Sequence, residues 1–200
     1  MTFAIHKRNR LPHWDVSHGI QLVTWHLADS LPKAALERLR CERAYERKRL
    51  TEGRGLVTKA DVASLDTAFR RQCEKLLDKS HGECVLRDHR AAKIVAEAIT
   101  HFDDGRYRLF AWCVMPNHVH TIFKTALPLA EVLHSWKSYT RTTINRLLSR
   151  TGKLWQDAYF DRLMRNEQQF RRAVEYVMNN PAKAGLRDWP FVRSYPERFP

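Results

Sequence analysis

Apolar and β-branched segments predict four strands along the chain. The first is 20–27, where aromatic and β-branched residues dominate. Segments 107–115 and 118–123 follow one another across Pro116-Asn117, and because Pro and Asn favour turns, the two segments predict a hairpin. Residues 159–165 predict the fourth strand.

Apolar residues recur at helical spacing in five further segments. These are 33–50, 65–78, 90–101, 129–150 after Pro128, and 167–179 before Asn180-Pro181. The order of strands and helices, with the extra helices treated as an insertion, resembles a ferredoxin-like split βαβ unit. We therefore expect an α+β fold with an antiparallel sheet, a helical insertion and a C-terminal helical extension.

The chain divides into three predicted parts. Residues 1–18 form a basic N-terminal arm, 19–187 form one domain with a helical insertion at about 51–104, and 188–200 form a C-terminal tail that wraps the surface. With 200 residues, 44% of them hydrophobic, the chain has the size of one domain and enough apolar residues for a core. This composition excludes a disordered chain.

Two patterns bear on location and on the cysteines. Apolar stretches fall short of the roughly 20 residues that a spanning helix needs, and the N-terminus lacks the apolar region of a signal peptide, so we expect a cytoplasmic protein without membrane contact.

Cys73, His81, Cys84 and His89 form a cluster whose spacing matches no zinc module. We expect buried, reduced thiols there.

Charge points to a polyanionic partner. Lys and Arg number 35 against 22 Asp and Glu, a net charge of +13, which exceeds what solubility needs and favours nucleic acid. Basic residues and aromatic residues interleave from 137 to 172, a pattern that suits single-stranded or hairpin DNA, although a solvated helix face with core aromatics would look the same. The residues assigned to DNA binding are Arg8, Arg10, Lys137, Arg141, Arg146, Arg150, Trp155, Gln156, Arg162 and Arg165.

The pair His118-Val119-His120 is the first candidate for chemistry. Alternate residues of a strand face the same side, so the two imidazoles should point together while Val119 points to the other face. Two imidazoles on one face can hold a divalent cation if a third ligand is present. Two surface or hydrogen-bonded histidines are the alternative.

Tyr139 is the second candidate. It falls on the helical stripe of Val132, Trp136 and Thr143, and periodicity alone predicts a core tyrosine. The chemical alternative is a nucleophile, because a tyrosine hydroxyl beside a metal-bound phosphate can attack phosphorus and form a phosphotyrosine. A phenol with its ordinary pKa of about 10 needs such activation.

The block Met115-Pro116-Asn117-His118-Val119-His120 resembles the REP-associated tyrosine transposases, a branch of the single-tyrosine HUH (IS200/IS605-like) transposases. The resemblance covers roughly 20–187. Its further blocks are 135–140, 144–145, 155–156, 159–161, Arg165, Tyr176 and 180–186.

This resemblance implies a ferredoxin-like fold and a defined reaction. His118 and His120 would bind Mg²⁺ or Mn²⁺, and Tyr139 would cut single-stranded hairpin DNA, keep the 5′ phosphate and leave a 3′ hydroxyl. Relatives take a third metal ligand from a polar side chain one turn after the tyrosine, often Gln. That place holds Thr143 here, a poorer ligand, with Gln156 and Asp161 as other candidates.

Three functions follow from these patterns. The first is a metal-dependent enzyme that nicks and joins hairpin DNA through a 5′-phosphotyrosine. The alternative is a catalytically weak, sequence-specific hairpin-DNA-binding protein, which the poor ligand at Thr143 favours. An RNA-binding ferredoxin-like domain would share the charge and fold but would not explain His118, His120 and Tyr139 together. We expect a monomer, with a dimer as the alternative.

Overall fold

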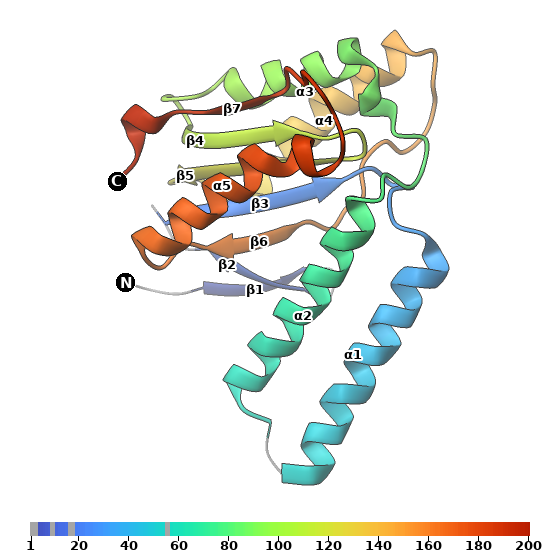
Figure 1. Ribbon diagram of the computed structural model, residues 1–200, viewed down its shortest axis with the longest axis vertical. Coiled ribbons are helices and arrows are strands. Elements are labelled where there is room, and N and C mark those ends of the chain that lie inside the picture. The colour runs from blue at the N-terminus through green and yellow to red at the C-terminus, as the bar shows by residue number, and fades with distance from the viewer. Residues whose placement is uncertain (1–3, 9–10, 16–18, 55–56) are drawn as a thin grey trace. The chain divides into compact units, whose positions relative to one another are not determined.

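The computed structural model describes residues 4–8, 11–15, 19–54 and 57–200, and the side chains of 19–53 and 57–200. Its centre is a five-stranded antiparallel sheet in the order β6-β3-β5-β4-β7 (Figure 1). The strands are β3 (Ile20–His26), β4 (Tyr107–Val114), β5 (His118–Thr125), β6 (Phe160–Leu163) and β7 (Val192–Ser194).

Four of these strands have the predicted ferredoxin-like arrangement. β3 and β5, the first and third of the four, lie in the centre, and β4 and β6 flank them. The predicted hairpin of β4 and β5 is confirmed, with a bulge between Leu109 and Ala111. β7 was not predicted: part of the C-terminal tail pairs with β4 and extends the sheet at that edge.

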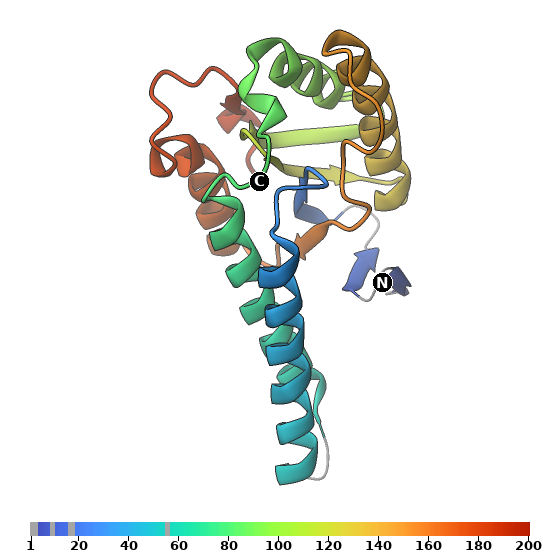
Figure 2. The ribbon, with the colours of Figure 1, turned by 90° about the vertical axis from the view of Figure 1, so that its right-hand side faces the viewer.

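Helices cover both faces of the sheet. α3 (His89–Thr100) and α4 (Leu129–Leu147) pack on one face, and α5 (Glu167–Lys183) packs on the other, as Figure 2 shows. The core under α3 and α4 is the larger and contains Trp25, Trp136 and Trp155. α5 continues past its predicted end at 179. Pro181 lies in its last turn, and the loss of one N–H donor there removes one helical hydrogen bond without ending the helix.

Residues 29–83 form a separate compact unit of two helices. These are α1 (Lys33–Arg54) and α2 (Lys59–Leu77), and Thr58 and Asp61 form a capping box at the start of α2. This unit begins and ends earlier than the insertion expected at about 51–104, because α1 pairs with α2 whereas α3 packs on the sheet. Gly82 has φ +86°, and a Cβ there would lie 2.8 Å from the carbonyl oxygen of Asp29, so this turn requires glycine.

The N-terminal arm contains two short antiparallel strands, β1 (Ala4–Arg8) and β2 (Leu11–Asp15). Arg8 lies in β1, and Arg10 lies outside the described residues. Two short 3-10 helices, Val85–Arg87 and Pro196–Arg198, complete the structure. Among the helices of the described residues, none is long and apolar enough to cross a membrane.

Candidate active site

His118 and His120 bring their imidazoles together on the α5 face of the sheet. Their Nε2 atoms lie 3.0 Å apart, and both residues are buried. Val119 packs on the opposite face, in the core under α3 and α4. The predicted alternation of β5 is therefore confirmed, and the two rings belong to the interior rather than to the surface.

Hydrogen bonds orient both rings. Nδ1 of His118 lies 2.7 Å from Oδ1 of Asn117, an acceptor, so the proton of His118 belongs on Nδ1 and its Nε2 keeps a lone pair. Nδ1 of His120 bonds the hydroxyl of Thr24 at 2.8 Å. Thr24 is the direct cross-strand neighbour of His120 on β3. Partners of this kind fix the tautomer and orientation of metal-binding imidazoles.

Burial keeps these imidazoles neutral. It lowers the pKa of His120 to about 3, and burial together with its neighbours His120 and His26 puts the pKa of His118 well below its usual value. With the proton of His120 on Nε2, that N–H can donate to Nε2 of His118, 3.0 Å away; with the proton on Nδ1, towards Thr24, both Nε2 lone pairs are free to bind a cation. The pair therefore fits a divalent cation that imidazole nitrogen can bind.

Acid should destabilise this protein through its buried histidines. Burial also lowers the pKa of His26 to about 4. Above pH 6.5 the folded and unfolded chains both hold neutral imidazoles. Below pH 6.5 the imidazoles of the unfolded chain take up protons, whereas the buried imidazoles of His26 and His120 stay neutral. The free energy of unfolding should therefore fall by about 2 kcal/mol per imidazole at pH 5.

Urea unfolding at pH 7.5 and at pH 5.0 measures this loss. His26→Gln removes one of the two buried imidazoles. The free energy of unfolding of this variant should therefore fall less between pH 7.5 and pH 5.0 than that of the wild-type protein. Equal stability of the wild type at both pH values would contradict the assignment of neutral, buried rings.

Tyr176 of α5 stands beside the imidazole pair. Its ring centroid lies 5.2 Å from that of His120, nearly edge to face. The ring is half-buried on the flank of α5. Nζ of Lys183 lies 5.3 Å from the centroid of the Tyr176 ring and places a positive charge there. A phenol and two metal-competent imidazoles thus meet on one face of the sheet.

Asn180 lies one helical turn after Tyr176 and is buried. Its Nδ2 donates to the carbonyl oxygen of Tyr176 at 3.0 Å, which leaves Oδ1 as the acceptor end of the amide. α5 runs antiparallel to β5, since Phe170 contacts Phe110, at the level of Phe123 in the sheet, and Tyr176 contacts His120. That direction carries Asn180 towards the His118 end of β5.

Tyr139 does not meet the histidines. α4 packs through Val132, Trp136 and Ile144 on the face of the sheet that carries Val119, so the sheet separates α4 from the imidazoles. The Tyr139 side chain is 57% exposed, so the periodicity-based prediction of a core tyrosine is wrong. Its assignment as the nucleophile is corrected for the same geometric reason, because within this chain its hydroxyl cannot approach a phosphate held at His118 and His120.

Of the three candidates for a third ligand, Thr143 and Asp161 lie on the α4 side of the sheet, away from the imidazoles, and the Gln156 side chain is engaged near its own backbone. Thr143 is on α4, and its hydroxyl donates to the carbonyl of Tyr139. Asp161 pairs with Val23 across β3 and β6 and so faces the α4 side. The amide oxygen of Gln156 accepts from the backbone N–H of Asp157. Among the described residues, no group of three or more His, Cys, Asp or Glu side chains could hold a metal ion. This finding also applies to Cys73, His81, Cys84 and His89.

The residues assigned to DNA binding differ in how far they are exposed and in what they contact. Arg141, Arg146, Arg162 and Arg165 are exposed, and Arg150 and Gln156 are partly buried. Trp155 is a core residue whose Nε1 donates to Thr140, so it cannot stack on a base. Lys137 is committed to backbone carbonyls of 156–158. The side chain of Arg8 lies outside the described ones.

The sequence did contain a signal for the missed tyrosine. Tyr176 and Asn180 both belong to the blocks that carry the family resemblance, and Asn180 supplies a polar side chain one turn after a tyrosine. Asn117 also belongs to such a block, the one that begins at Met115. Thr24 and His26 left no such signal, because they join the site through the pairing of β3 with β5, which a single sequence does not reveal.

The α+β fold and the buried imidazole pair are the features that comparison with known proteins sets in a family. Residues 83–180 match the model of the family Y1_Tnp, described as Transposase IS200 like. These 98 of the 200 residues are thus similar to this family of transposases.

The chain is also similar to REP-associated tyrosine transposases, as its motifs indicated. It is 30% identical over 94 residues to the REP-associated tyrosine transposase of Escherichia coli (strain K12), covering 44% of this chain and 54% of that protein. A protein of Haemophilus influenzae assigned to the same class is 23% identical over 103 residues, with 42% and 57% covered. The chain thus spans about half the length of these curated relatives.

A solved structure of a REP-associated tyrosine transposase bound to a REP hairpin aligns with 88% of this chain and 77% of that one. The sequence identity is 16% and the TM-score is 0.45.

Proposed function

We propose that the protein cuts and rejoins single-stranded hairpin DNA through a covalent 5′-phosphotyrosine formed by Tyr176. His118 and His120 would hold Mg²⁺ or Mn²⁺, and Oδ1 of Asn180 would be the third side-chain ligand. The observation that carries this proposal is the approach of the Tyr176 ring to 5.2 Å from His120, whose Nε2 lies 3.0 Å from that of His118. The similarity to a transposase family supports the reaction class.

The reaction needs few protein groups. Oη of Tyr176 attacks the scissile phosphorus, the P–O3′ bond breaks, and the released O3′ takes up a proton while the phenol loses one to water. A bound divalent cation would withdraw charge from the non-bridging oxygens of the phosphate. The phosphotyrosine conserves the energy of the broken bond, so a 3′ hydroxyl can reverse the step and join the strand.

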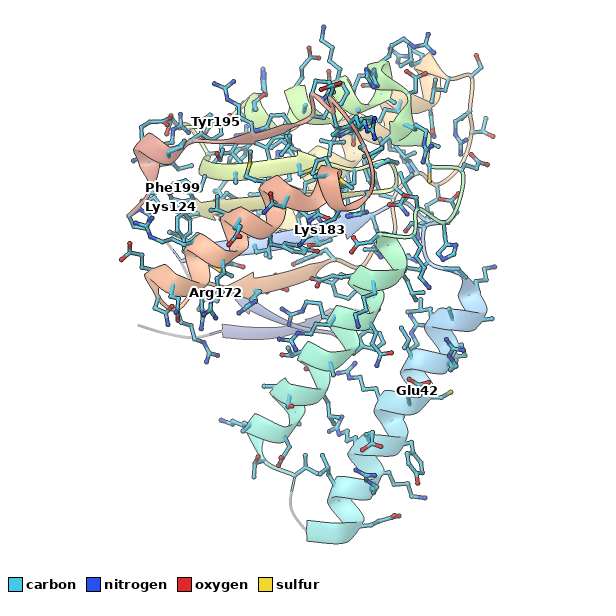
Figure 3. The ribbon with its side chains drawn as sticks, viewed as in Figure 1. Glu42, Lys124, Arg172, Lys183, Tyr195 and Phe199 are labelled. Atoms are coloured by element: carbon cyan, nitrogen blue, oxygen red, sulfur yellow. The ribbon has the colours of Figure 1, made fainter. Side chains whose placement is uncertain are left out.

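Positive charge surrounds the site on the α5 face. Arg172 and Lys183 lie on the same flank of α5 as Tyr176, one turn before it and two turns after it (Figure 3). Arg162 of β6 pairs with Leu22, whose side chain packs under α5, so Arg162 projects from the same face of the sheet. One cation at the Tyr176 ring, Lys183, and two more on the same face of the sheet suit the phosphates on both sides of a cleavage point.

The alternative of a catalytically weak binding protein loses its main support. It rested on the poor ligand one turn after Tyr139. Moving the nucleophile to Tyr176 replaces Thr143 with Asn180, whose amide oxygen is a suitable ligand for Mg²⁺ or Mn²⁺.

A denaturing gel tests the proposal. The protein is mixed with labelled single-stranded hairpins from palindromes flanking its gene, with Mn²⁺ or Mg²⁺. We expect a covalent protein–DNA band that a chelator abolishes and that RNA hairpins of the same sequence do not give. Binding on a native gel without a covalent band under any metal would sink the enzymatic proposal and favour the binding protein.

A further inference from the structure

A hollow opens on the α4 side of the sheet, away from the imidazoles. It consists of two cavities of about 490 and 720 Å³ between α4 and residues 151–159. Arg141, Lys153 and Asp157 line both cavities, so the two form one depression, which we call the α4 hollow. Each volume falls within the range of about 300–1,000 Å³ that small-molecule sites occupy.

The outer wall of the α4 hollow is held in place by α4 itself. Nζ of Lys137 donates to the carbonyl oxygens of Gln156 at 2.8 Å and Asp157 at 3.1 Å. Below this wall, Nε1 of Trp155 donates to the hydroxyl of Thr140 at 2.9 Å. Burial lowers the pKa of Lys137 to about 8. These contacts make the hollow a preformed surface rather than a loose loop.

The lining combines cations with an aromatic ring. Lys153 is paired with Asp157 at 2.8 Å, but Arg141 is exposed and has no hydrogen bond or ion pair with any described residue. The half-buried ring of Tyr159 and the hydroxyl of Ser138 line the same cavity. Nζ of Lys137 lies 5.7 Å from the centroid of the Tyr159 ring. An unpaired guanidinium and an aromatic ring that line one cavity suit the phosphate and base of one nucleotide.

The α4 hollow and the candidate active site flank the same end of the sheet. The backbone N–H of Gln156 donates to the carbonyl of His26 at 2.9 Å. Four residues later β6 begins at Phe160, whose ring stacks on His26 at 6.1 Å on the imidazole face. β6 is the edge strand of the five-stranded sheet, and β2 lies beside it. A single strand that passes the beginning of β6, where Gln156 and Phe160 meet His26, can reach both faces.

We propose that the α4 hollow binds one unpaired nucleotide of the substrate strand, apart from the cleavage point. Arg141 contacts its phosphate, and Tyr159 lies against its base. The inference rests on the proposed function for the nature of the substrate, single-stranded DNA beside a hairpin, and adds a site that holds this strand without taking part in the chemistry.

Binding of modified DNA to matched variants tests this site. Hairpins with a single-stranded flank are titrated in chelator, so that no cleavage occurs, and each flanking base is removed in turn. For the wild-type protein, we expect one abasic position to weaken binding about 5-fold or more. Arg141→Ala should weaken binding of the intact flank about 10-fold and lose its response to that position, whereas Arg141→Lys should keep part of it.

Controls separate this site from general charge and from catalysis. Lys93→Ala removes an exposed cation of α3 that is paired with Glu97, and should bind all DNAs as the wild type does. A flankless hairpin should bind Arg141→Ala and wild type equally. The inference fails, even where a covalent band forms, if Arg141→Ala and the wild type respond alike to every abasic position. It also fails if Arg141→Ala weakens binding of the flankless hairpin as much as binding of the flanked one. Dependence on Arg141 without any covalent band would uphold the hollow and overturn the proposed reaction instead.

Discussion

Tyr176→Phe is expected to abolish the covalent protein–DNA band, with a loss of at least about 10³-fold in cleavage rate. The substitution removes only the hydroxyl, so the ring keeps its edge-to-face contact with His120 and its contact with Lys183. DNA affinity on a native gel should stay within about 2-fold of wild type, because charge and shape are unchanged. The measurement is the single-turnover rate of adduct formation on a labelled hairpin in Mn²⁺.

Tyr139→Phe is the matched control for this experiment. It removes the same atom from an exposed tyrosine on the other side of the sheet, and we expect its adduct rate to equal that of the wild type. A normal rate in Tyr176→Phe with a lost adduct in Tyr139→Phe would reverse the assignment. It would also require that a second copy of the chain bring its α4 to these imidazoles.

Loss of one imidazole should remove both metal binding and cleavage. In His120→Ala, one of the two Nε2 atoms that face each other disappears. Because a single imidazole without its partner holds Mn²⁺ or Mg²⁺ poorly, we expect at least a 100-fold weaker metal affinity, estimated from the roughly 10–100-fold that second-shell changes alone cost. Mn²⁺ titration followed by electron paramagnetic resonance measures this affinity, and adduct formation should fall in parallel.

Thermal unfolding shows whether the variant is folded and whether it binds metal. Mn²⁺ at 100 times its dissociation constant should stabilise the wild-type protein by about 2.7 kcal/mol, and it should leave His120→Ala unchanged. Thr24→Val removes the hydroxyl partner of His120 Nδ1, and Mn²⁺ should stabilise this variant less than the wild type but more than His120→Ala. His101→Gln changes an exposed histidine of the same unit and should behave as wild type. Full metal stabilisation of His120→Ala would exclude this pair as the metal site.

Much of this architecture follows from local pattern. The apolar runs of β3, β4 and β5 and the helical stripes of α3, α4 and α5 predict the elements and the ferredoxin-like order. The alternation of β5 alone brings His118 and His120 to one face, because side chains of a strand alternate with a period of two. The short strand β7 escaped prediction because its three residues are too few to show an alternating pattern.

The candidate nucleophile was decided by tertiary structure. Tyr139 and Tyr176 each lie on an amphipathic helix, and periodicity says which side of a helix is apolar but not which face of the sheet that side covers. α4 covers the face of Val119 and Phe123, and α5 covers the face of His120 and Ile122. The sequence by itself determined the imidazole pair, the fold class and the family resemblance. Only the packing of α4 and α5 on opposite faces decided that Tyr176, and not Tyr139, meets that pair.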